Sequence, residues 1–361
     1  MSDDLAIGVV GLGHGANHAR ILSQLPGVRL AAVCDLDESR LASAAKGRSL
    51  RTYTHYEAML AEEALDAVVV AVPARLHEAV AIAAIEAGCA LLVEKPLAPS
   101  LEEGKRLAQA ASNAGVALMP GHIERFNPAV RELTKRVRAG EVGAVLDLTA
   151  RRMGPIVIRT LGPDVNVVYD TAIHDIDVMR YILGAEVERA YCEARSDLGL
   201  PFEDSIIGLL RFSPKIEERW TSLPASESLG SAQFEARRLG EGATATLDAN
   251  WLAPRRIRDL TVRGTEGVFV LDYMAQTLEL YPGKASLEQP GGSANSQPQA
   301  ISIPIEQDEP LLQELTAFVA ALRQGRPMPV TADDALAALS VCDALTESAR
   351  TGLPVIPARV R

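Results

Sequence analysis

The sequence has few cysteines, no excess of positive charge and no long hydrophobic run. Its four cysteines lie far apart among 361 residues and form no C-x-x-C pair, so neither a zinc cage nor a disulfide framework is indicated. The net charge of −11 argues against nucleic acid or an anionic membrane as a partner. The richest apolar region is interrupted at Pro73 and His77, well short of the length that spans a bilayer.

The chain also begins without the basic segment of a secretory signal, so we expect a cytoplasmic protein. Hydrophobic residues make up 48% of the sequence, enough for a sizeable core, and the length suits about two domains. Cys34 and Cys89 stand in apolar surroundings and are expected to be buried thiols.

A glycine-rich turn follows the first apolar strand, which we place at residues 6–10. The turn reads Gly11-Leu12-Gly13-His14-Gly15-Ala16, and a helical pattern runs on to residue 25. This is the G-x-G-x-x-G/A arrangement, in which Gly11 makes the tight turn, Gly13 admits a pyrophosphate and Ala16 permits close helix packing. The helix N-terminus would then bind the phosphates.

An acid closes the next strand, at residues 28–34. Asp35 stands where a carboxylate binds the ribose hydroxyls and repels a 2′-phosphate, which favours NAD over NADP. The alternative is a helix N-cap at Asp35 or Asp37, and both roles are compatible.

Strands and helices continue to alternate, which predicts a doubly wound parallel sheet in residues 1–120. A strand at 67–72 ends at Pro73, and His77 lies in the first turn of the helix after it, where an exposed helix histidine is the alternative. A strand at 91–93 ends in Glu94, Lys95 and Pro96. Because ligands bind at the carboxyl ends of such strands, Lys95 is placed to face a cleft. The alternative is an ordinary surface loop.

The pattern changes in residues 121–361. Strand-like runs at 145–151, 205–212, 243–249, 258–263 and 267–273 have few helices between them, which predicts an α+β domain with a mostly antiparallel sheet. Residues 282–299 read as an exposed loop. Two helices, at about 309–324 and 332–351, end the chain and are expected to pack back on the first domain.

The densest polar stretch of this second half is residues 168–178. Asp170 and His174 are four apart and share a helix face, and a histidine beside a carboxylate suits acid–base chemistry. A metal site is a weaker alternative, because no further His or Cys stands at ligand spacing. The structural alternative is an N-cap at Asp170 and a hydrogen-bonded core histidine at His174.

Together these motifs resemble the glucose–fructose oxidoreductase/inositol 2-dehydrogenase (Gfo/Idh/MocA) family, over nearly the whole chain. The resemblance implies a Rossmann domain, a second domain whose sheet often forms the oligomer interface, and a homodimer or homotetramer. It implies that Lys95, Asp170 and His174 are catalytic, with Asp170 orienting His174 or the substrate. The cofactor, NAD rather than NADP, would contact Gly11, Gly13, His14, Ala16, Asp35, Pro73, His77, Glu94 and Lys95.

A narrower resemblance concerns the substrate. Residues 121–128, 250–252 and 264–267 are similar to members that act on the 3-hydroxyl of UDP-N-acetylglucosamine, and residues 213–241 look longer than in those members. The resemblance implies a sugar or nucleotide sugar bound by His122, Arg125, Arg152, Tyr169, Asp170, His174 and Arg256. Arg151 and Arg255 are further candidates for a pyrophosphate, with solvated surface arginines as the alternative.

The resulting interpretation is an NAD-dependent dehydrogenase that oxidises a secondary sugar hydroxyl. Three alternatives remain open: an inositol or free-sugar dehydrogenase, an NAD-dependent glycoside cleavage that oxidises and re-reduces the sugar, and a non-catalytic NAD-binding regulator. The joint presence of Lys95, Asp170 and His174 argues against the last of these.

Overall fold

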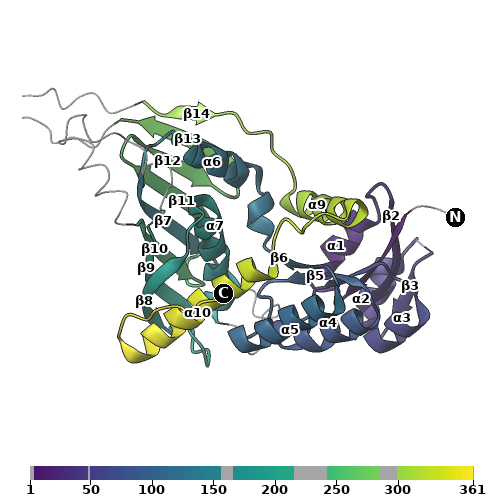
Figure 1. Ribbon diagram of the computed structural model, residues 1–361. Helices are drawn as coiled ribbons and strands as arrows, with labels where there is room; N and C mark the ends of the chain where they lie inside the picture. The colour runs from purple at the N-terminus through teal and green to yellow at the C-terminus, as the bar shows by residue number, and fades with distance from the viewer. Residues whose placement is uncertain (1–3, 48, 156–165, 215–241, 284–298, 361) are drawn as a thin grey trace, which may run out of the picture.

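A computed structural model describes residues 4–47, 49–155, 166–214, 242–283 and 299–360. The chain builds two sheets that stand apart, with helices between and around them (Figure 1). The predicted fold class, a Rossmann domain joined to a domain with a mostly antiparallel sheet, is confirmed. No helix in the described ranges is long and apolar enough to cross a membrane.

The first sheet has six parallel strands in the order β3-β2-β1-β4-β5-β6. The strands β1, β4 and β5 are buried almost throughout, as expected for a parallel sheet covered on both faces. Sequence reasoning did not delineate β3, a short edge strand with two exposed residues. The strands are β1 (Leu5–Val10), β2 (Val28–Cys34), β3 (Arg51–Tyr53), β4 (Ala67–Val70), β5 (Ala90–Glu94) and β6 (Leu118–Gly121).

Helices follow these strands and cover both faces of the sheet. They are α1 (Gly15–Leu22), α2 (Glu38–Ala45), α3 (Tyr56–Glu62), the short η1 (Ala74–Leu76), α4 (His77–Glu86) and α5 (Leu101–Ala114). Both ends of α5 are capped: the Ser100 side chain accepts from the Glu103 N–H, and Gly115 ends the helix in the left-handed conformation.

The second sheet has eight strands in the order β14-β13-β12-β11-β7-β10-β9-β8. The pair β7–β10 is parallel, and the other pairs are antiparallel. The strands are β7 (Val145–Met153), β8 (Val187–Arg195), β9 (Ser205–Phe212), β10 (Thr244–Asn250), β11 (Ile257–Gly264), β12 (Gly267–Asp272), β13 (Thr277–Pro282) and β14 (Ile301–Ile303). Five of these strands were predicted; β8, β13 and β14 were not, because polar residues interrupt their apolar pattern.

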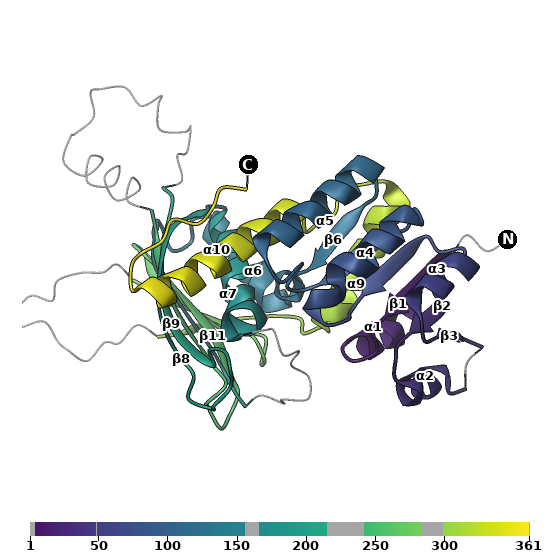
Figure 2. The same ribbon diagram turned by 90° about the horizontal axis from the view of Figure 1, so that it is seen from below.

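Three helices lie on the face of this sheet that looks toward the first sheet (Figure 2). They are α6 (Pro128–Arg138), α7 (Ile173–Leu183) and α10 (Ala332–Thr351). Two short segments, η2 (Ile123–Phe126) and the π-helical η4 (Val168–Ala172), lead into α6 and α7. The predicted loop at 282–299 and the long stretch at 213–241 lie almost wholly outside the described residues.

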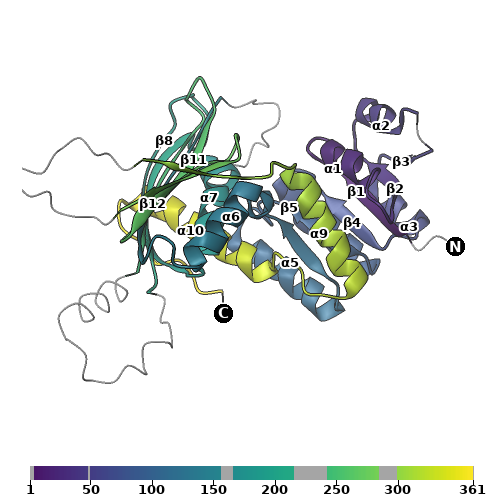
Figure 3. The ribbon, with the colours of Figure 1, turned by 90° about the horizontal axis from the view of Figure 1, so that it is seen from above.

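The helix α9 (Pro310–Gln324) belongs to the end of the chain but packs on the first sheet, beside α1 (Figure 3). Its Leu315 and Phe318 are fully buried in one core with Ile7 and Val9 of β1. The end of the chain therefore returns to the glycine-rich turn and helps to fix α1.

Candidate active site

The glycine-rich turn owes its shape to Gly11. Its φ is +90°, and a Cβ atom there would lie 2.5 Å from the Ala71 carbonyl oxygen, so no other residue fits without displacing the backbone. By contrast, a Cβ on the exposed Gly13 would meet only Arg40, at 3.9 Å. The bare backbone of Gly13 is therefore open, and its contact with a pyrophosphate stays a prediction.

Close packing of α1 on the sheet depends on Gly15 and not, as predicted, on Ala16. A Cβ atom on Gly15 would lie 3.0 Å from Val9 and 3.1 Å from Ala71, whereas Ala16 is exposed. His14, just before the helix, is also exposed and makes no side-chain cap. Ala16 and His14 therefore line the outer side of the turn, where a cofactor would approach.

Asp35 ties the turn to the end of β2. Its carboxylate accepts from the Leu12 N–H at 2.5 Å and from the Asp37 N–H at 2.8 Å. The helix cap is Asp37, whose side chain accepts from the Ser39 N–H, so the N-cap alternative holds for Asp37. Asp35 stands at the carboxyl end of β2, where a ribose would bind.

His77 is buried and not exposed, so the alternative of an exposed helix histidine is wrong. Its Nδ1 lies 2.9 Å from the Pro96 carbonyl oxygen and its Nε2 lies 2.8 Å from that of Val72. Burial lowers the pKa of His77 despite these carbonyls. The ring connects the segment after β4, which contains Pro73, to the loop that carries Lys95.

Glu94 is paired with a residue that sequence reasoning missed. His18 of α1 lies 2.7 Å from the Glu94 carboxylate. Burial opposes the ionisation of Glu94, but the His18 contact and the charges of His18 and Lys95 outweigh it and lower the pKa of Glu94 to about 2. Glu94 is thus an anion next to Lys95. No local spacing signals this pair, since 76 positions separate the two residues.

A second acid, Glu314, lies near Glu94 in surroundings that disfavour its ionised form. Glu314 of α9 is fully buried, and neither carboxylate oxygen has a hydrogen-bond partner among the described residues. Burial, with the charge of Glu94, raises the pKa of Glu314 well above its ordinary value. Glu314 therefore keeps its proton to a higher pH in the folded protein than in the unfolded chain.

Glu314 should make the protein less stable as the pH rises. Above pH ~4.5 the unfolded chain ionises this carboxyl while the native state keeps its proton, so stability falls by up to about 1.4 kcal/mol per pH unit until the folded-state pKa is reached. We expect Glu314→Gln to raise the melting temperature, by more at pH 8 than at pH 5. Glu86 is exposed, and Glu86→Gln is the control. An equal effect of Glu314→Gln at both pH values would contradict the raised pKa of Glu314.

Lys95 and Asp170 join the two sheets. Lys95 Nζ donates to the Asp170 carboxylate at 2.9 Å and to the Asp170 carbonyl oxygen at 2.7 Å. Burial disfavours the carboxylate, but Lys95 outweighs it and lowers the pKa of Asp170. Thr171 adds support, because its hydroxyl donates to Asp170 at 3.2 Å and accepts from the Trp251 indole at 2.9 Å. The predicted catalytic lysine and aspartate are thus brought together.

His174 lies beside this pair without bonding to Asp170. The expectation that Asp170 orients His174 is therefore corrected: in the structure Asp170 holds Lys95, and the alternative of an N-cap at Asp170 is wrong because the residue stands inside η4. The Nδ1 of His174 has no partner in the described part of the chain. Burial and the charges of Lys95 and Arg152 hold the pKa of His174 well below its ordinary value, so the ring is neutral.

Two arginines predicted to bind substrate are already paired with carboxylates. Arg125 bonds both oxygens of Asp177, at 2.6 and 2.7 Å. Arg152 bonds Asp175 at 2.8 and 3.1 Å and Glu124 at 2.9 Å. Because all four of these arginine and aspartate side chains are buried, they hold η2 and β7 to α7.

The other predicted substrate residues have different surroundings. His122 is buried, with its Nδ1 3.7 Å from Asp177, and burial lowers its pKa. The Tyr169 hydroxyl donates to Asp343 of α10 at 2.6 Å; sequence reasoning missed Asp343. Arg256 is exposed.

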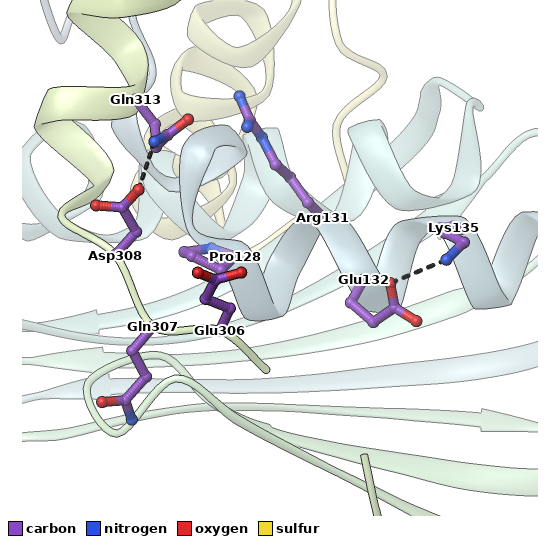
Figure 4. A pocket seen from close by; sticks show the side chains of 8 residues that line it. All are labelled: Pro128, Arg131, Glu132, Lys135, Glu306, Gln307, Asp308 and Gln313. Carbon is purple, nitrogen blue, oxygen red and sulfur yellow. Dashed lines mark hydrogen bonds and ion pairs between the residues drawn. The ribbon is translucent and has the colours of Figure 1, made fainter. Parts of the chain in front are cut away.

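An open hollow of about 640 Å³ lies elsewhere, between α6 and the segment that leads into α9 (Figure 4). Its lining is mostly polar: Pro128, Arg131, Glu132, Lys135, Glu306, Gln307, Asp308 and Gln313. None of the predicted site residues is among them. Nor do three His, Cys, Asp or Glu residues converge as metal ligands anywhere in the described ranges. The candidate active site is therefore the place where Lys95, Asp170 and His174 meet.

Comparison with known families gives two matches, one in each half of the chain. An oxidoreductase family with an NAD-binding Rossmann fold (GFO_IDH_MocA) matches residues 5–122, and the C-terminal alpha/beta domain of the same family matches residues 162–356.

Individual relatives carry several names. Inositol 2-dehydrogenase of Corynebacterium glutamicum is 34% identical over 52% of this chain and 56% of its own length. UDP-N-acetylglucosamine 3-dehydrogenase of Acidithiobacillus ferrooxidans is 37% identical over 50% of this chain and 54% of its own. The chain thus spans little more than half the length of these relatives. The scyllo-inositol 2-dehydrogenase (NAD(+)) of Bacillus subtilis is 29% identical over 98% of this chain and 97% of its own.

Solved structures share the fold. Levoglucosan dehydrogenase in complex with NADH superposes with a TM-score of 0.80 at 19% identity, covering 99% of this chain and all of the other.

Proposed function

Because the chain belongs to the oxidoreductase family with an NAD-binding Rossmann fold and a C-terminal α/β domain, we propose that it is an NAD-dependent dehydrogenase acting on a secondary hydroxyl of a sugar or polyol. The observation that carries this proposal is the ion pair between Lys95 and Asp170, which brings a lysine from the end of β5 against the second half of the chain beside His174. Proton transfer in such a reaction needs a positioned base.

The first sheet fits NAD. Gly11 and Gly13 leave the backbone of the turn bare, the N-terminus of α1 points its free N–H groups to the same place, and Asp35 stands at the ribose position. The remaining residues proposed for the cofactor site are His14, Ala16, Pro73, His77 and Glu94. His77 would act by holding the segment after β4 to the loop that carries Lys95. When bound, the oxidised nicotinamide would supply the hydride acceptor.

The residues of the chain would manage the proton. Lys95, which holds its ammonium proton in the ion pair with Asp170, would first release that proton to solvent. As the carbinol carbon then loses a hydride and becomes a ketone, its hydroxyl proton would pass to the Lys95 amine. Asp170 holds the Lys95 amine in place, and the neutral His174 ring holds the hydroxyl by a hydrogen bond. Because burial and the charges of Arg152 and Arg258 oppose a charge on His174, we assign the proton acceptor to Lys95 and a hydrogen-bonding role to His174.

The substrate in this proposal is a UDP-N-acetylhexosamine oxidised at its 3-hydroxyl. The similarity to UDP-N-acetylglucosamine 3-dehydrogenase supports it. The second candidate is an inositol, which the named inositol dehydrogenases among the relatives favour.

A panel of UDP-sugars, free sugars and inositols, each with NAD and with NADP, tests this function through the absorbance of reduced nicotinamide. We expect NADH to accumulate with NAD and a UDP-N-acetylhexosamine. NADH formation with inositols alone would show that the substrate is a polyol and not a nucleotide sugar. No reduced nicotinamide with any compound would contradict the dehydrogenase.

A further inference from the structure

Two arginines lie side by side on the sheet face next to His174. Arg258 of β11 pairs in register with Arg152 of β7, so both side chains point to the same face. That face is the one under α7, because Arg152 bonds Asp175 of α7. Arg258 also lies close enough to His174 to lower the pKa of the ring.

The two arginines differ in their partners. Arg152 has the carboxylates of Asp175 and Glu124, whereas Arg258 has neither a hydrogen bond nor an ion pair within the described ranges of the chain. Burial, then the charge of Arg152, lowers the pKa of Arg258, and the attraction of Glu124 does not make up for them. A half-buried guanidinium without a bonded anion is costly, and this cost is removed when an anion binds.

A further arginine continues this row toward solvent. Arg256 is two positions before Arg258 and exposed, and it lies over Gly154, where a Cβ atom would come within 2.9 Å of the Arg256 Cγ. The missing side chain at Gly154 leaves room for the Arg256 stem. Arg256 and Arg258 thus lead from the rim of the sheet to His174.

The other cations nearby are already in use. Lys95 is paired with Asp170 at 2.9 Å, and Arg152 is paired with two acids. A negatively charged ligand that passes Arg256 would therefore find Arg258 as the cation beside His174 without a bonded carboxylate among the described residues.

We propose that Arg258, with Arg256 at the rim, binds an anionic oxygen group, a carboxylate or a phosphate, that the sugar carries close to the carbon being oxidised. This inference rests on the proposed dehydrogenase function and changes its substrate from a UDP-N-acetylhexosamine, whose sugar is neutral, to an acidic sugar, such as a uronic acid, a sugar phosphate or their nucleotide-linked forms. It concerns charge at the reacting end of the substrate, and a remote pyrophosphate alone would not satisfy it.

The test compares charged and neutral partners of the same sugar. With the full chain and saturating NAD, kcat/KM is measured for D-glucuronate, D-glucose 6-phosphate and D-glucose, and for UDP-N-acetylglucosamine and its uronate. We expect the uronates or the sugar phosphate to exceed their neutral partners by about 10- to 100-fold, as a charge-assisted hydrogen bond allows. A preference for D-glucuronate over D-glucose identifies the anion as a carboxylate, and a preference for D-glucose 6-phosphate identifies it as a phosphate.

Variants assign this preference to Arg258. Arg258→Gln should abolish the ratio of charged to neutral substrate, and Arg258→Lys should keep part of it. The control Arg263→Gln removes an exposed arginine of the same strand, which pairs with Asp147 on the opposite face, and should leave the ratio unchanged. Equal rates for charged and neutral sugars, or a ratio that survives in Arg258→Gln, would overturn the subsite.

A binding measurement separates this inference from the proposed function. If no sugar is oxidised, the dehydrogenase fails, but the melting temperature of the NAD-saturated protein still reports binding. A larger increase with D-glucuronate or D-glucose 6-phosphate than with D-glucose, lost in Arg258→Gln, supports the subsite. Equal increases, or none with any of the three, overturn it.

Discussion

Lys95→Met is expected to lower kcat/KM for sugar oxidation by about 10²- to 10⁴-fold, the usual contribution of a positioned proton acceptor. The reason is local: Lys95 Nζ is held by two oxygens of Asp170 beside His174, and methionine fills similar space without accepting a proton. Steady-state formation of NADH at saturating NAD measures the loss.

The control for this prediction is Lys105→Met, which removes a more exposed lysine paired with Glu102 on α5. It should have wild-type kinetics. NAD affinity, measured by calorimetry, should stay within a few-fold in Lys95→Met, which would show that the cofactor site is intact. A Lys95→Met enzyme with nearly unchanged kcat/KM would show that the proton goes elsewhere.

Asp177→Ala is expected to lower the free energy of unfolding by about 3–5 kcal/mol, because it leaves a buried arginine without its main partner. Asp177 is 1% exposed and bonds Arg125 through both oxygens. Asp334 lies 3.1 Å from Arg125 but is partly exposed and replaces only part of this interaction. Urea denaturation at pH 7 measures the change.

The chain offers a matched surface pair as a control. Asp147 bonds Arg263 through both oxygens, at 2.8 and 2.9 Å, but on the exposed face of the sheet. Asp147→Ala should cost no more than about 1 kcal/mol. Similar losses from Asp147→Ala and Asp177→Ala would mean that burial does not set the value of these pairs.

Local sequence signals were enough to predict the buried strands of the first sheet, but not its exposed edge strand β3. Apolar runs as uniform as residues 67–70 fit only strands covered on both faces, and the positive φ of Gly11 explains why a glycine turn follows β1. Caps such as Ser100 and Gly115 mark the ends of a helix within one turn. These features depend on residues that are neighbours in the sequence, so local sequence patterns are sufficient to predict them.

The partners of the charged groups were not predictable in this way. Asp170 and His174 share a helix face by spacing, yet a lysine 75 positions away takes the carboxylate. His18 and Glu314 carry no local sign of their closeness to Glu94. Such contacts depend on how α1, α9 and β5 pack, and a hydrophobic pattern does not encode which polar groups face one another.

Substrate residues were the least predictable part of the site. Arg125 and Arg152 resemble ligand-binding cations in the sequence, but the fold neutralises both with aspartates of α7. Arg258 carries no local signal, because in the sequence it is a single arginine within a predicted strand. Its importance appears only when the register places it beside Arg152 and leaves it without a carboxylate.

The most direct test of the account is the stoichiometry of the reaction with the best sugar of the panel. Wild-type protein should form one NADH and one keto-sugar for each sugar consumed, while Lys95→Met binds NAD equally well and forms neither at a comparable rate. Sugar consumed without NADH, or equal NADH formation by both proteins, would contradict a dehydrogenase centred on Lys95.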